Sequence, residues 1–289
     1  MIQATRPEAP PGSPLLLGAS PLEAVAFWVT AAFTAAAVVG FATFGQNPEL
    51  LGSVPWAMGI YSVSYTLFSV GQIVLAGAAI ALLLVLRTGV QWIPAFVALY
   101  IISLGSELAG TNVGLPFGHY DYTAGLGPQW FDDVPLVIPL SWFMMAIPSY
   151  YLALKALPNA GPLGHIGLGA VILTGWDLAL DPAMSYATVY WLWETTGPYY
   201  GMPWINLGGW LFTSLLLMGA LVLLRAETWM EALPGPWLVA FYAINVLLPL
   251  GMVAAAGLVW SLVVTLAFYG ALVLFARRFT NHAAGARTP

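Results

Sequence analysis

The 289-residue chain contains no cysteine and very few charged residues. Without cysteine it can form neither disulfides nor thiolate-ligated metal sites. Charged residues make up 7% of the sequence, whereas a soluble domain carries about 25%. Because 60% of the residues are hydrophobic, the composition predicts an integral membrane protein made mainly of membrane-spanning segments.

Basic residues are scarce, and this excludes several classes of function. The formal net charge is −5 and no basic cluster is present, so a nucleic-acid partner is not expected. The only lysine, Lys155, ends an apolar segment, which argues against a retinal Schiff base. Diphosphate-dependent prenyl transfer needs basic residues beside clustered acids to hold the phosphates. The scarcity of basic residues therefore argues against this reaction. His119, His165 and His282 are far apart in the sequence, so no metal site is expected.

Eight apolar segments are each long enough to cross a bilayer. They lie at 22–45, 61–86, 91–111, 134–155, 163–186, 203–225, 236–255 and 257–278. The sequence therefore predicts an all-α, polytopic transmembrane bundle formed by one domain, 22–279, between a disordered N-terminal tail, 1–21, and a cytoplasmic C-terminal tail, 280–289. Only Ala256-Gly257 joins the last two segments, so a bent hairpin, or one span plus a surface helix, is an alternative for that region.

The basic residues predict the orientation of the chain. With eight spans, the basic residues at the ends of the segments and both termini lie on one side of the membrane. The charged residues on the other side are all acidic. The basic set is Arg87, Lys155, Arg225, Arg277 and Arg278, and the acidic set is Glu49, Asp121, Asp132, Asp133 and Glu194. By the positive-inside rule both termini are cytoplasmic, which is the arrangement expected in a cell (inner) membrane.

Three acids, Glu107, Asp177 and Asp181, fall inside apolar segments. Intramembrane ionisable residues are costly and are therefore functional candidates, although a neutral carboxyl joining helices is the alternative. In the predicted topology all three lie in the outer half of the bilayer. Asp177 and Asp181 share one helical face, and Pro182 should end or bend their helix. Since no basic residue is near, we expect at least one acid to stay protonated and to serve as a general acid.

A polar pocket without basic residues, lined by aromatic rings, suits protonation of an apolar alkene. A carboxylic acid would supply the proton, and the faces of Trp and Tyr rings would stabilise the resulting tertiary cation. Capture of the cation by water gives hydration, whereas capture by an internal double bond gives cyclisation. Neither route needs a cofactor or a metal.

The motifs around these acids resemble the CruF-type membrane carotenoid C-1,2 hydratases, which include the bisanhydrobacterioruberin hydratases of haloarchaea. The resemblance covers roughly residues 100–215. The matching residues are Glu107-Leu108-x-Gly110-Thr111, Gly114-x-Pro116-Phe117-Gly118-x-Tyr120-x-Tyr122, Gly127-Pro128, Val134-Pro135, Trp142, Trp176-Asp177-Leu178-x-Leu180-Asp181-Pro182-x-Met184, Trp191, Trp193, Tyr200-Gly201-x-Pro203 and Asn206-x-x-Gly209-Trp210. At His119 the chain departs from the family pattern, which has a basic residue, often Arg.

The resemblance implies a cofactor-independent enzyme of carotenoid biosynthesis, a hydro-lyase. Such an enzyme adds water across the terminal C1=C2 double bond of an acyclic ψ-end group, as in lycopene or γ-carotene. We hypothesise that Asp177 or Asp181 protonates C2 and that Glu107 holds and deprotonates the water, or the reverse. The residues expected to line the substrate or cation are Phe117, Tyr120, Tyr122, Trp142, Trp176 and Trp210; His119 and Asn206 would orient water.

Two other readings stay open. A carotenoid ψ-end cyclase, or another isoprenoid enzyme, would begin with the same protonation. A non-enzymatic lipid or pigment carrier, or a proton-coupled transporter, would use the same buried acids without this chemistry. The expected partners are membrane lipid and a hydrophobic carotenoid substrate. Apolar faces on the first and the last two segments are compatible with a homo-oligomer, and association with other carotenoid biosynthesis enzymes is also compatible with the sequence.

Overall fold

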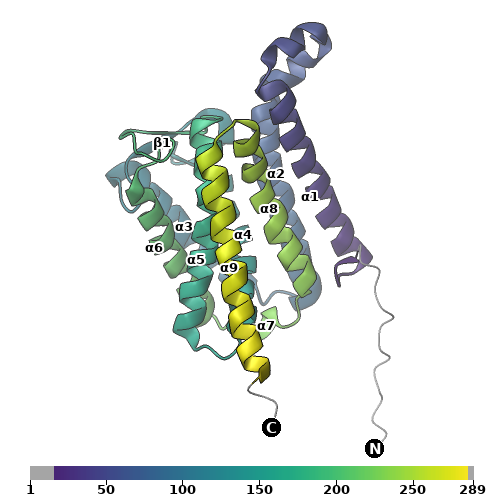
Figure 1. Ribbon diagram of the computed structural model, residues 1–289, viewed down its shortest axis with the longest axis vertical. Helices are drawn as coiled ribbons and strands as arrows, with labels where there is room; N and C mark the ends of the chain where they lie inside the picture. The colour runs from purple at the N-terminus through teal and green to yellow at the C-terminus, as the bar shows by residue number, and fades with distance from the viewer. Residues whose placement is uncertain (1–15, 286–289) are drawn as a thin grey trace, which may run out of the picture.

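The computed structural model describes residues 16–285 and shows a bundle of long helices (Figure 1). Eight helices of the described chain are long and apolar enough to cross a membrane, which confirms the predicted polytopic all-α bundle. They are α1 (Pro21–Gly40), α2 (Met58–Thr88), α3 (Ile93–Val113), α4 (Val137–Ala156), α5 (Pro162–Asp181), α6 (Trp204–Leu223), α8 (Gly235–Ala255) and α9 (Val259–Gly285).

The last two segments form two separate helices rather than one bent element. Helix α8 ends at Ala255 and α9 begins at Val259, and Gly257 adopts a positive φ of 70° in the turn between them. α1 begins and α9 ends at the same end of the bundle (Figure 1). This agrees with an even number of crossings, while the cytoplasmic location of that end stays a prediction. Residues 1–15 and 286–289 of the predicted tails lie outside the described residues.

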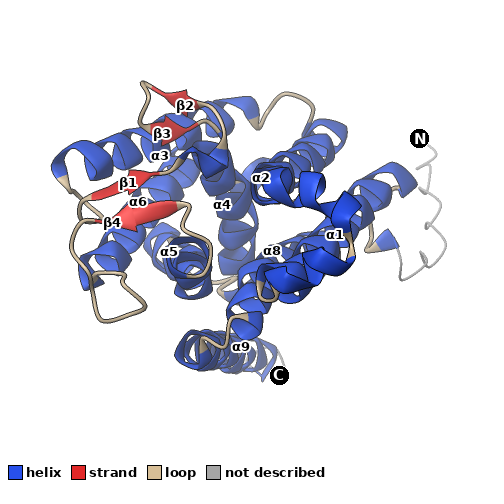
Figure 2. Cartoon of the chain, turned by 90° about the horizontal axis from the view of Figure 1, so that it is seen from above, coloured by secondary structure: helices blue, strands red, loops and turns tan. Residues whose placement is uncertain are grey.

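Helix α4 is the centre of the bundle. Within its membrane-crossing window 83% of the residues are buried, whereas the corresponding value for α9 is 11%. Helix α4 packs against α2, α3, α5, α6 and α8, and its sequence is apolar on every face, as expected of a helix enclosed by others. In Figure 2, α3, α5 and α6 lie on one side of α4 and α1, α2 and α8 on the other.

Short elements cover one end of the bundle. Strands β1 (Tyr120–Tyr122) and β4 (Trp191–Trp193) pair antiparallel, with Tyr120 opposite Trp193 and Tyr122 opposite Trp191. Strands β2 (Gln129–Trp130) and β3 (Val134–Pro135) form a second small ribbon after the 3₁₀ turn η5 (Ala124–Leu126). Above α1 and α2 the chain forms η2 (Phe41–Gly45), η3 (Pro48–Ser53) and η4 (Pro55–Ala57). The short helix α7 (Glu227–Met230) lies at the opposite end.

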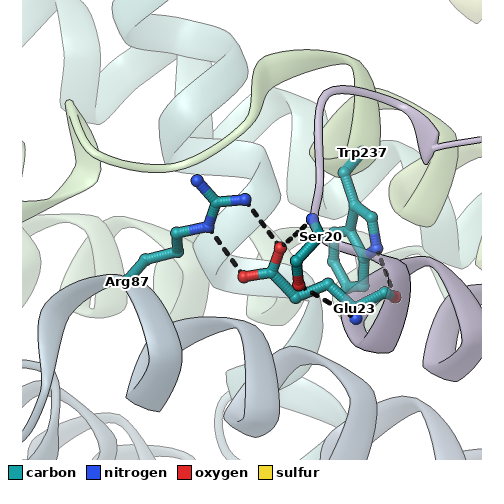
Figure 3. A network of polar contacts seen from close by, with 4 residues as sticks. All are labelled: Ser20, Glu23, Arg87 and Trp237. Atoms are coloured by element: carbon teal, nitrogen blue, oxygen red, sulfur yellow. Dashed lines mark hydrogen bonds and ion pairs between the residues drawn. The ribbon is translucent and has the colours of Figure 1, made fainter. Parts of the chain in front are cut away.

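At the end opposite the strands, one buried carboxylate joins three helices (Figure 3). Glu23, 1% exposed, accepts hydrogen bonds from the Arg87 guanidinium at 2.7 and 2.6 Å. It also accepts the main-chain N–H of Ser20 at 2.6 Å in a capping box. The indole of Trp237 donates to the Glu23 carbonyl at 3.0 Å. These contacts fix the start of α1 to α2 and α8.

Candidate functional site

The carboxyl of Glu107, on α3, is 5% exposed and is supplied with three hydrogen-bond donors. The Trp142 indole donates to one oxygen at 2.8 Å. The Tyr122 hydroxyl donates to the other oxygen at 2.8 Å, and the Tyr120 hydroxyl donates to that same oxygen. Hydrogen bonds of this kind favour the charged form of a carboxyl, whereas burial away from water favours the neutral form.

The two tyrosines reach Glu107 because the loop after α3 can approach the helices closely. A Cβ on Gly110 would lie 2.9 Å from both Phe117 and Tyr120, and one on Gly209 would lie 2.6 Å from the Pro116 carbonyl oxygen. Only glycine allows this approach. Burial, with the nearby Glu107 carboxyl, holds the pKa of Tyr120 and of Tyr122 well above the usual range. Both hydroxyls therefore remain protonated donors.

Asp177 and Asp181 lie one helical turn apart near the end of α5 and are 0% and 1% exposed. The Asn206 side-chain nitrogen, from α6, donates to Asp177 at 2.8 Å and lies 3.5 Å from Asp181. Asp181 also accepts from Ser185 at 2.8 Å. The second oxygen of Asp177 is buried without a hydrogen-bond partner in the described chain.

The β1–β4 pairing links Asp181 to the Glu107 side of the site. The indoles of Trp191 and Trp193 donate to the two oxygens of Asp181, at 3.2 and 3.4 Å. Trp193 packs on Tyr120 with ring centroids 5.1 Å apart, and Trp191 packs on Tyr122 at 6.0 Å. The same pair of strands thus supplies donors to both carboxyls. We call Glu107, Asp177 and Asp181 the acid cluster.

Pro182 ends α5 directly after Asp181, as the sequence predicted, and starts the π turn η6 (Pro182–Tyr186). Because proline lacks an N–H, the carbonyl of Leu178 has no donor from the next turn. That carbonyl instead accepts the Tyr199 hydroxyl at 2.7 Å and the Ser261 hydroxyl at 2.8 Å. The carbonyl beside the acids is therefore occupied by side chains of the loop between β4 and α6 and of α9.

Indole rings form a wall beside the acids. Trp142 and Trp210 stack with centroids 4.1 Å apart, and Trp176 meets Trp210 edge to face at 6.1 Å. The Trp176 indole donates at 3.1 Å to the Asn245 carbonyl, which the helix-interior proline Pro249 leaves without its usual donor. Trp142 and Trp176 are thus fixed by hydrogen bonds to different helices.

The structure brings together ten of the eleven residues predicted for the site. The three acids, Asn206, Phe117, Tyr120, Tyr122, Trp142, Trp176 and Trp210 are connected by the contacts above and by the packing of Phe117 on Tyr120 and Trp142. His119 is different, because its side chain is exposed and its ring lies against Gly114. No described hydrogen bond joins the His119 side chain to the acid cluster.

Sequence reasoning missed Ser185 as a carboxyl donor and the support that α8 gives to Trp176. The spacing of Ser185, four residues after Asp181, was an available signal. The link from Asn245 to Trp176 had no local signal. Among the described residues, no group of three His, Cys, Asp or Glu side chains is placed to hold a metal ion.

Comparison with known proteins gives two kinds of relative. The chain is 34% identical over 186 residues to the bisanhydrobacterioruberin hydratase of Haloarcula japonica, covering 63% of this chain and 61% of the relative. It is 28% identical over 179 residues to the potassium-binding subunit of a potassium-transporting ATPase from Bordetella pertussis, covering 57% of this chain and 28% of that subunit. The chain thus matches less than two thirds of the length of either relative. No solved structure matches it.

A family model described as carotenoid biosynthesis protein matches residues 68–272. This range exceeds half of the chain and contains the acid cluster with all its hydrogen-bond donors. The chain therefore belongs to the family of carotenoid biosynthesis proteins.

Proposed function

We propose that this protein hydrates a carotenoid, adding water across the terminal C1=C2 double bond of an acyclic ψ-end group of the lycopene or γ-carotene type. The family membership and the hydratase relative support the substrate class. The observation that carries the chemistry is the buried Asp177 oxygen without a partner, in a site with three carboxyls and a wall of indole rings.

Asp177 is the proton donor in this proposal. Glu107 has donors on both oxygens, and so does Asp181. Asp177 accepts one strong hydrogen bond, from Asn206. Burial disfavours a charged carboxyl, and two carboxylates a turn apart disfavour each other. Of the three acids, Asp177 therefore has the least support for a charge and carries the proton.

Proton transfer from Asp177 to C2 forms a C–H bond and leaves a tertiary cation at C1. The stacked pair Trp142 and Trp210 and the edge-on Trp176 present π electrons to this charge. The carboxylates of Glu107 and Asp181 add electrostatic stabilisation in a dry site, where it is strongest. No cofactor takes part in the step.

Water then attacks C1 and loses a proton to Glu107, giving the tertiary alcohol. One proton leaves Asp177 and one reaches Glu107 for each water added, so the cycle closes when that proton returns to Asp177. The hydroxyls of Tyr120 and Tyr122 orient Glu107 for this role. We place the site in the outer half of the inner membrane, on the basis of the predicted orientation.

The test is expression of the full chain in a bacterium that accumulates lycopene, followed by liquid chromatography and mass spectrometry of the pigment. We expect a product heavier by one or two waters with the polyene absorbance unchanged. An isomer of unchanged mass with a shortened chromophore would identify a cyclase instead. Unmodified lycopene and γ-carotene from well-expressed protein would contradict the proposal and favour a carrier or transporter.

A further inference from the structure

An apolar cavity of about 560 Å³ lies between α1, α2 and α8, below η3 and η4. None of the three acids lines it. Seven aromatic rings supply much of its wall: Phe41, Phe44, Trp56, Tyr61, Tyr65, Phe68 and Tyr190. Its size is that of a small-molecule site. A cavity with this lining suits a long unsaturated hydrocarbon, because it offers ring faces and few polar groups.

The cavity and the acid cluster share one stretch of chain as their common wall. Met184 and Tyr190 line the cavity. Asp181, three residues before Met184, and Trp191, directly after Tyr190, hydrogen-bond to each other in the acid cluster. The Tyr190 hydroxyl donates to the Tyr65 carbonyl at 2.8 Å, and the Tyr190 N–H donates to the Met184 carbonyl at 2.6 Å. The segment from Asp181 to Trp191 thus contributes both to the acid cluster and to the cavity wall.

Met184 is the flexible part of this wall. It is unbranched and polarizable, and such side chains change shape at low cost. Helix α8, whose Leu248 and Met252 line the cavity, packs against both α5 and η6. A rigid polyene leaving the acid cluster past Met184 would therefore enter the cavity on the side of α8.

The acid cluster and the cavity also differ in their relation to the family. The acid cluster lies wholly within the matched region, residues 68–272. Most residues that line the cavity, from Ala37 to Tyr65, precede that region. The chemistry thus resides in the part of the chain that the family model describes, and the cavity arises where another segment packs on that part.

We infer that this cavity holds the polyene chain of the substrate whose ψ end reacts at the acid cluster, and that its lining selects the carotenoid. The inference rests on the proposed hydration. It assigns the reaction to the acid cluster and the recognition of chain length and far end to residues 37–69. The competing occupant is an acyl chain of a bilayer lipid.

Filling the cavity tests the inference. A Cβ at Gly40 meets nothing within 4 Å, and Gly40 lines the cavity, so Gly40→Trp would occupy it. Ala57→Phe, on η4, is a second filling variant. The matched control is Ala36→Trp, since Ala36 is an exposed residue of α1 outside the lining. Each variant is assayed in membranes with lycopene and with a short acyclic isoprenoid that has the same ψ end.

We expect the filling variants to lower lycopene hydration at least about tenfold, the scale of a changed apolar pocket, and to leave the short substrate unaffected. The control should match wild type with both substrates. Filling variants that hydrate lycopene at the wild-type rate would overturn the inference. If wild type hydrated neither substrate, the proposed function itself would have failed.

A photolabelling experiment tests occupancy of the cavity independently of turnover. An acyclic isoprenoid with a diazirine at the end opposite its ψ group is photolysed with wild-type protein, and the labelled peptides are identified by mass spectrometry. We expect labels within residues 37–69 that added lycopene removes and Gly40→Trp abolishes. Labels elsewhere, or labels displaced by phospholipid and not by lycopene, would show that the cavity does not hold the polyene.

Discussion

Asn206 donates its side-chain N–H to one oxygen of Asp177 at 2.8 Å, and the other oxygen of that carboxyl is buried without a partner in the described chain. This one-sided support distinguishes Asp177 from Glu107 and Asp181, whose oxygens all accept hydrogen bonds. An unsupported buried oxygen is where a carboxyl proton is best placed, because the neutral form avoids an unsolvated charge.

Asp177→Asn should remove the proton donor while keeping the shape of the site. We expect the hydration rate to fall by about 10²–10⁴-fold, the usual contribution of a general acid, with normal amounts of protein in the membrane. Asp121→Asn is the matched control, because Asp121 is exposed on β1, and it should keep full activity. An Asp177→Asn variant with wild-type activity would remove Asp177 from the mechanism.

Gly110→Ala should separate Tyr120 from Glu107. The added Cβ would lie 2.9 Å from Phe117 and Tyr120, so these rings must shift and the hydrogen bond to Glu107 lengthens. We expect at least about tenfold lower activity, since loss of a hydrogen bond to a charged group costs about 1.5–3 kcal/mol. The control is Gly105→Ala on the same helix, because a Cβ at Gly105 meets nothing within 4 Å. Equal activities of the two variants would contradict this account of Gly110.

Pro249→Ala should stabilise α8 and impair the site. The restored N–H of residue 249 would bond the Asn245 carbonyl and compete with the Trp176 indole. We expect the unfolding temperature in detergent, measured by circular dichroism, to rise. Turnover should fall severalfold, which corresponds to the loss of about 1 kcal/mol from one hydrogen bond. Pro162→Ala, at the first turn of α5, is the control and should change neither. A fall in stability together with activity would indicate that Pro249 has only a structural role.

Glu23→Ala should destabilise the packing of α1, because it leaves the Arg87 guanidinium and the Ser20 N–H without their acceptor. Arg87 is 30% exposed, so we expect a loss of about 2 kcal/mol, below the 3–5 kcal/mol of a fully buried pair. The double variant Glu23→Ala/Arg87→Met should lose less than Glu23→Ala alone. Glu49→Ala, in an exposed turn, is the control for unfolding in detergent. A double variant less stable than the single one would contradict this reasoning.

The orientation can be measured directly because the chain has no cysteine. Asp121→Cys places a thiol in the loop with the strands, and Asn159→Cys places one between α4 and α5, at the opposite end. Both positions are exposed. By the positive-inside rule a membrane-impermeant maleimide should label Asp121→Cys in intact cells and Asn159→Cys only after lysis. The reverse pattern would place both termini outside.

The sequence by itself determined the helices and the identity of the acids. The length of each apolar run is set by the thickness of the bilayer, so the number and the approximate positions of the eight spans follow from composition alone. Glu107, Asp177 and Asp181 stand out because a carboxyl in an apolar run is costly. The break after Asp181 follows from Pro182, whose missing N–H acts locally.

Only the tertiary structure decided which groups surround each acid. The donors from β1 and β4 meet because strands about seventy residues apart pair in a fixed register, and a three-residue strand has too little periodicity to specify its partner. The same pairing places Tyr120 in the site, while the adjacent His119 lies outside it. Likewise, the cavity between α1, α2 and α8 depends on how helices pack, which each helix's own hydrophobic pattern leaves open.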